Sequence, residues 1–167
     1  MSFEEKVIER DLNKWNVLVA SLIAGFSKLG ILSQAVVNKD MEMVADKLAR
    51  YFKTQHNIPD IQENSNYMEN LTKIIKFLDL ELEMAAEKNI VSGEENLEFR
   101  VTTNTCNFCP KGVGEAELAG TACPYPALIK EFANFFLPES QKIEIVAQNR
   151  NSMKKEDGVC SIIFRKK

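Results

Sequence analysis

The sequence of 167 residues has almost no histidine, and it lacks the common motifs of enzymes that depend on this residue. The single histidine, His56, lies in a polar stretch just before Ile58 and Pro59, which favours a surface position over a catalytic one. No Ser/His/Asp set, phosphate-binding loop or GxGxxG fingerprint can be recognised. The sequence therefore predicts no catalytic residue, and an enzymatic activity is not expected.

Long apolar segments are also missing. A membrane-spanning helix needs roughly 20 apolar residues, whereas the best candidate, Val17 to Leu29, is shorter and is interrupted by two serines, a glycine and a lysine. The residues before it are acidic, although a secretory signal begins with basic residues. We therefore expect a cytoplasmic protein that has no membrane partner.

An excess of positive charge is the third absence. The 21 basic side chains are outnumbered by 24 acidic ones, which leaves a net charge of −3 and argues against a nucleic-acid partner. Apolar residues make up 45% of the chain and charged residues 27%, as is usual for a globular protein. The length suffices for one domain with a hydrophobic core but is short for two.

The first part of the chain is rich in helix signals. Apolar residues recur at three- and four-residue spacing from Ser2 to Leu29 and predict one long helix, with a possible bend near Gly25 and a stop at Gly30. Because Trp15 and other apolar residues surround much of this helix, packing against a second copy is plausible, and a homodimer is predicted.

The remaining elements are expected in the order helices, hairpin, loop, helix, hairpin. A second helix is predicted to begin at Asp40, and a third to run from residue 64 or 65 to about Leu78. Strands are predicted at 78–84, 97–101, 143–147 and 161–164, with turns at 92–96 and 157–158 and a further helix at 125–136.

This order predicts a single α+β domain over residues 1–167. Its helical part covers about residues 1–78, and its cysteine-bearing hairpin, helix and hairpin cover about residues 79–167. The N-terminal helices would pack on a small antiparallel sheet made of two hairpins, with one helix between them.

The four cysteines are the strongest chemical signal in the sequence. Cys106 and Cys109 form a CxxC pair at the end of a predicted strand, Cys123 follows in the next loop, and Cys160 lies in the last predicted strand. Four thiolates satisfy the tetrahedral coordination of a closed zinc site, so these cysteines are predicted to be metal ligands. If all four bind the metal, no position remains for substrate, and the metal is structural.

Other interpretations of the cysteines remain open. The prolines after Cys109 and Cys123 are also typical of iron–sulfur motifs, so an iron–sulfur cluster is the alternative to zinc. A CxxC pair also suits thiol–disulfide exchange, and isolated cysteines are often buried simply as small apolar residues.

Two segments resemble the 4-vinyl reductase domain family. One is Cys123-Pro-Tyr-Pro-Ala-Leu-Ile-Lys-Glu-Phe-Ala-Asn, a cysteine leading into an amphipathic helix, and the other is Asp157-Gly-Val-Cys-Ser-Ile-Ile-Phe164. The resemblance covers roughly residues 80–167. It implies a sensory domain that holds a hydrocarbon or aromatic ligand beside a zinc site, with Cys123 and Cys160 among the ligands. The sequence departs from the family pattern at Asn149 and Ser152, where better zinc ligands are expected.

These observations lead to one leading function and several rivals. We expect a domain that binds a small hydrophobic ligand or acts as a sensor, stabilised by a cysteine-bound metal. The apolar helix at 125–136 would belong first to the core and only then to a ligand-binding wall. The alternatives are an iron–sulfur redox protein, a metal- or thiol-dependent enzyme, and a dimerisation module without a ligand.

Overall fold

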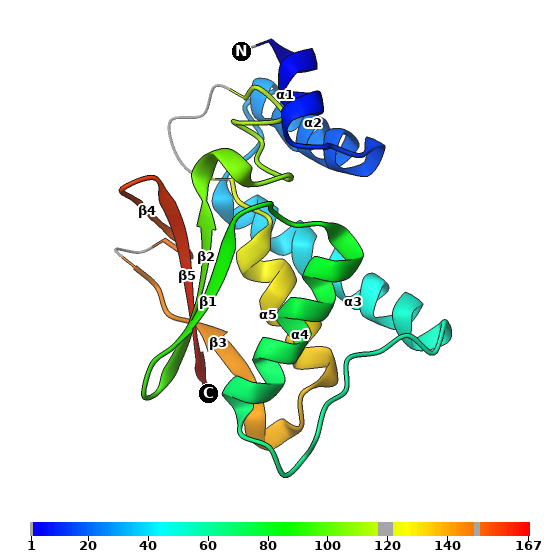
Figure 1. The fold of residues 1–167 in the computed structure, drawn as a ribbon, viewed down its shortest axis with the longest axis vertical. Coiled ribbons are helices and arrows are strands. Elements are labelled where there is room, and N and C mark those ends of the chain that lie inside the picture. The colour runs from blue at the N-terminus through cyan, green and yellow to red at the C-terminus, as the bar shows by residue number, and fades with distance from the viewer. Residues whose placement is uncertain (1, 117–121, 149–150) are drawn as a thin grey trace.

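The computed structural model describes residues 2–116, 122–148 and 151–167. Its described part is α+β, with five α-helices and one five-stranded antiparallel sheet. Figure 1 shows the sheet on one side of the molecule and helices α4, α5 and α3 on the other, with α1 and α2 across one end. The predicted fold class is therefore confirmed.

The helices begin where polar side chains accept hydrogen bonds from the first free N–H groups. The side chains of Ser2, Asn13, Ser33 and Asn66 provide these caps for the first four helices. The fifth helix begins after Pro124, whose ring suits the first turn. The helices are α1 Phe3–Glu9, α2 Lys14–Lys28, α3 Gln34–Thr54, α4 Tyr67–Leu82 and α5 Tyr125–Phe136.

The sheet is organised around its last strand. Strand β5 pairs with β2, β3 and β4, all antiparallel, and β1 pairs with the outer edge of β2. The predicted arrangement as two hairpins is thus not confirmed, because the 157–158 turn joins β5 to β4, while β3 also pairs with β5. The strands are β1 Lys88–Ser92, β2 Asn96–Thr102, β3 Ile143–Ile145, β4 Lys154–Glu156 and β5 Val159–Lys166.

The long first helix is a wrong prediction, because the structure contains two helices there. Asp11 has a left-handed backbone with a φ of 49°, which no α-helix accommodates. Asn13 then caps α2 in a reciprocal pair of side-chain hydrogen bonds with Asn16. Gly25 causes no interruption and lies inside α2. The apolar spacing continued across this break and therefore concealed it.

Two other boundaries differ from the prediction. Helix α3 begins six residues before Asp40, because the hydroxyl of Ser33 accepts a hydrogen bond from the N–H of Val36. The strand predicted at 78–84 is instead the end of α4, which stops at Glu83 in a left-handed conformation. Leu78 is fully buried while Leu80 is 77% exposed. Alternate leucines mislead here because residues four apart, such as 78 and 82, also share a helix face.

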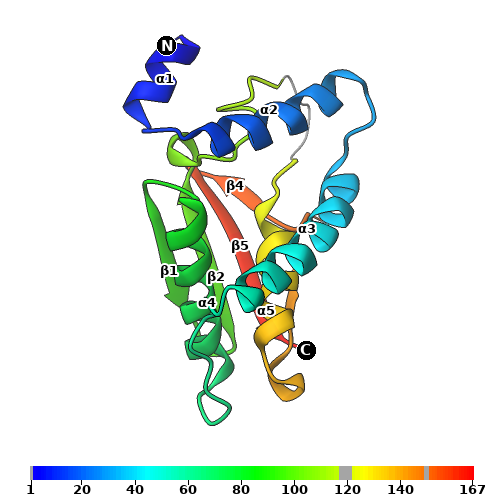
Figure 2. The same cartoon turned by 90° about the vertical axis from the view of Figure 1, so that its right-hand side faces the viewer.

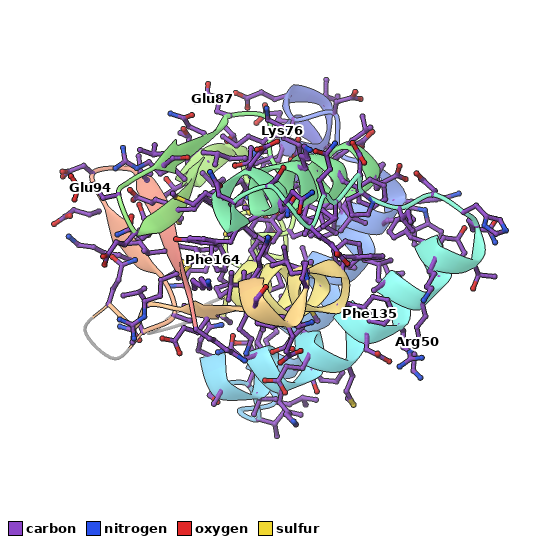
Figure 3. All side chains as sticks on the ribbon, turned by 90° about the horizontal axis from the view of Figure 1, so that it is seen from below. Arg50, Lys76, Glu87, Glu94, Phe135 and Phe164 are labelled. Atoms are coloured by element: carbon purple, nitrogen blue, oxygen red, sulfur yellow. The ribbon has the colours of Figure 1, made fainter. Side chains whose placement is uncertain are left out.

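The main core lies between the sheet and helices α4 and α5, and α3 packs on α5 on the side away from the sheet (Figure 2). Phe164 points from β5 into this interior, whereas Glu87 and Glu94 lie at the periphery (Figure 3). The buried members from the strands are Leu97, Phe99, Val101, Ile143, Ile162 and Phe164, and those from the helices include Leu71, Ile74, Leu78, Ile129 and Phe132.

Helix α2 is attached to the rest of the molecule differently. Its Ala20 belongs to a small apolar cluster with Leu12 and Val113, and its Ile23 to another with Val37 and Ala122. Both clusters are smaller than the main core, against which Val19 of α2 also packs. In the part of the chain that the structure describes, no helix is both long and apolar enough to cross a bilayer.

Candidate functional site

All four cysteines line one hollow of about 90 Å³, which we call the thiol pocket. Cys106 and Cys109 enter it from the loop after β2, Cys123 from two residues before the start of α5, and Cys160 from β5. The remaining lining residues are Val101, Thr103, Pro110, Lys111, Ala122, Pro124, Tyr125, Met153, Lys155 and Ile162.

Backbone contacts hold each cysteine in place. Cys160 lies opposite Val101 in the register of β2 and β5. Cys106 forms an antiparallel bridge with Ala85, which ties the loop to the end of α4. The carbonyl oxygen of Cys109 accepts hydrogen bonds from the N–H groups of Val113 and Gly114 and so closes the following turn. Pairing within the sheet and this turn therefore bring together cysteines that are more than 50 residues apart in sequence.

The two thiols of the CxxC pair have different hydrogen-bond partners. The Cys106 thiol donates a hydrogen bond to the hydroxyl oxygen of Tyr125 at 3.5 Å. The N–H of Gly112 donates a hydrogen bond to Cys109 Sγ at 3.3 Å. Cys106 is buried, whereas Cys109 is half-buried and reaches the edge of the pocket. The two sulfurs thus have different access to solvent.

These contacts move the pKa values of the two thiols in opposite directions. The neighbouring thiol of Cys106 lowers the pKa of Cys109 to about 6, and the N–H groups of Gly112 and Lys111 and the charge of Lys155 act in the same sense. The interaction with Cys109 and burial raise the pKa of Cys106 well above its usual value. Cys109 is therefore the group that carries negative charge at neutral pH.

The other two thiols stay protonated. Burial raises the pKa of Cys123, and the nearby sulfurs of Cys160 and Cys109 raise it further. Burial also raises the pKa of Cys160, although the charge of Lys155 partly opposes this effect. The pocket thus offers one thiolate among three neutral thiols.

Tyr125 separates the thiol pocket from a second, larger one. Its hydroxyl donates a hydrogen bond to the carbonyl oxygen of Met84, and its ring meets the rings of Phe108 and Phe99 edge-on, at 6.0 and 6.3 Å between centroids. Burial raises the pKa of Tyr125 well above its usual value, so the hydroxyl is neutral. Tyr125 and the adjacent Pro124 line both pockets.

The second pocket, which we call the apolar pocket, has a volume of about 390 Å³ and lies between α2, α3 and the start of α5. Asp40 is the one charged side chain among the described residues that line it, and it is exposed. The other lining residues are Val19, Leu22, Ile23, Phe26, Leu32, Val37, Met41, Val44, Leu48, Leu82, Phe108, Pro124, Tyr125 and Leu128.

The metal centre expected from the cysteines is a wrong prediction. Across residues 2–116, 122–148 and 151–167, no three or more His, Cys, Asp and Glu side chains are grouped so that they could hold a metal ion. Lining one hollow is a weaker condition than pointing four sulfurs at one point, which tetrahedral coordination requires. Zinc, its iron–sulfur alternative and a structural metal are therefore not supported. Asn149 lies outside the described residues.

A comparison with protein-family models finds a match over residues 30–166. The chain belongs to the MJ0207 family. The protein named "Uncharacterized protein MJ1342" of Methanocaldococcus jannaschii is 28% identical over 114 residues, which cover 68% of this chain and 89% of that relative. No solved structure matches the chain. The family match contains the four cysteines and helices α3 to α5, and α1 and α2 precede it.

This family corrects the resemblance to 4-vinyl reductase domains, which is wrong. The two segments that suggested it encode common local structures. Cys123-Pro124 begins helix α5, and Asp157-Gly158, both with positive φ, form the turn between β4 and β5. A helix start and a tight turn recur in many folds, so two short segments do not specify one family.

Sequence reasoning missed the residues around the cysteines. Tyr125 was assigned only to a helix, and neither Phe108 nor Lys155 was singled out. The aromatic residue inside the CxxC motif was a signal for Phe108, because an apolar residue between two cysteines packs beside them. For Lys155 no such signal existed, since the pairing of β4 with β5 alone places it opposite Cys160.

Proposed function

We propose that this protein binds an uncharged, hydrophobic small molecule in the apolar pocket. The observation that supports this proposal is a volume of about 390 Å³ lined almost wholly by aliphatic and aromatic side chains. Ligand sites in proteins typically range from about 300 to 1,000 Å³ and have this type of lining. A charged ligand is disfavoured, because its desolvation has no compensating partner among the apolar lining residues.

The volume limits the size of the ligand. A cavity of about 150 Å³ accommodates benzene, so a pocket of about 390 Å³ suits a molecule of about 15 carbon atoms. The rings of Phe26, Phe108 and Tyr125 line the pocket and favour an aromatic ligand. Asp40 offers a carboxylate to a hydroxyl group of the ligand.

The two walls of the apolar pocket, from α2 and α5, support a sensory role because they are attached to the molecule differently. Helix α5 contributes several buried residues to the main core, whereas α2 packs against that core through the partly buried Val19 and is otherwise held by two small clusters. A ligand that contacts both walls stabilises one position of α2 relative to α5. Binding would then be read out as a change in the mobility or position of α2. A cytoplasmic location and a homodimer formed through α2 remain predictions.

The test is a pair of tryptophan substitutions on α3. Val44 lines the apolar pocket and is 44% exposed, whereas the adjacent Met43 is 60% exposed and lines no part of it. Val44→Trp places an indole in the pocket, and Met43→Trp places one outside. The fluorescence of 2-naphthol, a neutral aromatic probe, reports binding to the native chain and to both variants.

We expect saturable binding to the native chain and to Met43→Trp. Binding to Val44→Trp should be at least about tenfold weaker, a loss of roughly 1.4 kcal/mol, because the indole fills part of the pocket. Thermal unfolding checks that both variants fold. Equal affinity in all three proteins, or no saturable binding of the probe to the native chain, would refute the proposal.

A further inference from the structure

The thiol pocket contains a pair of sulfurs arranged for a reaction that the apolar pocket does not require. Cys106 and Cys109 are separated by two residues, and both line the thiol pocket from the same loop. The CxxC spacing is compatible with a disulfide, in which the two Cβ atoms lie about 3.5 to 4.5 Å apart. Cys123 and Cys160 line the same hollow from other elements.

We propose that Cys106 and Cys109 form a redox-active dithiol, which a hydroperoxide oxidises to a disulfide. The size of the thiol pocket favours this class of oxidant. About 90 Å³ is roughly three times the volume that one water molecule occupies in the liquid. Hydrogen peroxide fits such a space.

The two cysteines have different parts in the reaction. Cys109 is the more accessible of the two, and it lies beside the N–H of Gly112 and the cationic side chain of Lys155, both of which stabilise a thiolate. As a thiolate, its sulfur attacks one oxygen of the peroxide, the O–O bond breaks, and the products are a sulfenic acid and a hydroxide ion that takes a proton from solvent to become water. Cys109 is thus the peroxidatic thiol.

The buried Cys106 resolves the sulfenic acid. Its sulfur attacks Cys109 Sγ, the S–S bond forms as the S–O bond breaks, and the departing hydroxide takes the proton of Cys106 as a second water. Two thiols lose two electrons in total, and one hydrogen peroxide is reduced to two water molecules. A low-molecular-weight dithiol reverses the change by thiol–disulfide exchange.

The first experiment uses the native chain. The reduced protein is treated with one equivalent of hydrogen peroxide, its remaining thiols are alkylated after unfolding, and the disulfide is mapped by peptide mass spectrometry. We expect the number of alkylated cysteines to fall from four to two, with a link between Cys106 and Cys109 that dithiothreitol removes. Four alkylated cysteines after peroxide, or a disulfide that includes Cys123 or Cys160, would overturn the proposal.

Variants separate the two steps. In Cys106→Ser, Cys109 should stop as a sulfenic acid that dimedone labels, whereas Cys160→Ser should still form the disulfide.

The lysine variants test the charge beside Cys109. Lys155→Gln should slow oxidation severalfold. Lys154→Gln should not, because Lys154 is also exposed but does not line the thiol pocket. Oxidation of the Lys155→Gln and Lys154→Gln variants at the native rate would remove Lys155 from the site. Binding of 2-naphthol is measured separately, so failure of either proposal leaves the other standing.

Discussion

The apolar pocket and the thiol pocket lie on two sides of Pro124 and Tyr125, yet they are built differently. The apolar pocket takes one wall from α2, which is held by two small clusters and touches the main core through the partly buried Val19. The thiol pocket is formed by residues of the main core and by cysteines packed against it. A ligand can enter the apolar pocket more easily if one of its walls can move. Two sulfurs in the thiol pocket react with each other faster if their geometry is fixed.

The largest effect is expected where the two pockets meet. Tyr125→Ala should lower the free energy of unfolding by about 3–5 kcal/mol, as truncation of a buried aromatic residue does. Tyr125→Phe removes only the hydroxyl contacts with Met84 and Cys106 and should lower it by about 1–2 kcal/mol. Urea unfolding measures both.

The same two variants test whether the pockets are distinct. Tyr125→Phe keeps the ring and should bind 2-naphthol as the native chain does. The rate at which peroxide oxidises the Cys106–Cys109 pair should change, because the hydroxyl contact with Cys106 is lost. Weaker probe binding to Tyr125→Phe would show that the hydroxyl, and not only the ring, serves the apolar pocket.

A smaller effect is expected at the contact between α2 and the loop after Cys109. A Cβ atom added to Gly114 would lie 2.3 Å from the carbonyl oxygen of Ala20 and 2.8 Å from Ala24 Cβ. Gly114→Ala should therefore destabilise the protein by about 1–3 kcal/mol and weaken probe binding, because α2 must shift. Its control is Gly25→Ala in α2, where the added Cβ has no neighbour within 4 Å. That variant should gain up to about 1 kcal/mol from helix propensity.

The reactivity of the four cysteines should differ strongly with pH. Because Cys109 has a pKa of about 6, about nine tenths of it is thiolate at pH 7. Its alkylation by iodoacetamide in the folded protein should rise through pH 6 and level off above pH 7. The charged and titratable groups that line the thiol pocket with it are Lys111, Lys155, Tyr125 and the thiols of Cys106, Cys123 and Cys160.

These three thiols should remain slow to react up to alkaline pH, because their pKa values are raised. Mass spectrometry of the labelled peptides measures each rate. Equal pH profiles for Cys109 and Cys160 would contradict the assignment of the thiolate.

The smallest effect on stability is expected on the outer face of α2. Trp15 is 61% exposed there and lines neither pocket. If α2 forms the predicted homodimer, Trp15→Glu should convert dimers to monomers in light scattering while changing the free energy of unfolding by less than about 0.5 kcal/mol. A native chain that is monomeric at the same concentration would show the prediction of a homodimer to be wrong.

Local signals determined much of the fold. The apolar spacing and the stop at Pro138 predicted the helix at 125–136, and the turn residues at 92–96 predicted the turn before β2, because these features act within a few residues. The first strand of that hairpin was predicted at 78–84 and lies at 88–92 instead. The break at Asp11 and the helical end of α4 escaped the same reasoning, since one apolar pattern fits both structures over a short window.

The sequence by itself determined that this is an α+β protein with four cysteines, two of them in a CxxC pair that follows a strand. Only the tertiary structure decided what those cysteines form. The pairing of β5 with β2 and β4 brings Cys160 and Lys155 to the CxxC loop, and the packing of α2 over α3 and α5 leaves the apolar pocket. Both depend on contacts between residues far apart in the chain, which spacing along the sequence does not encode.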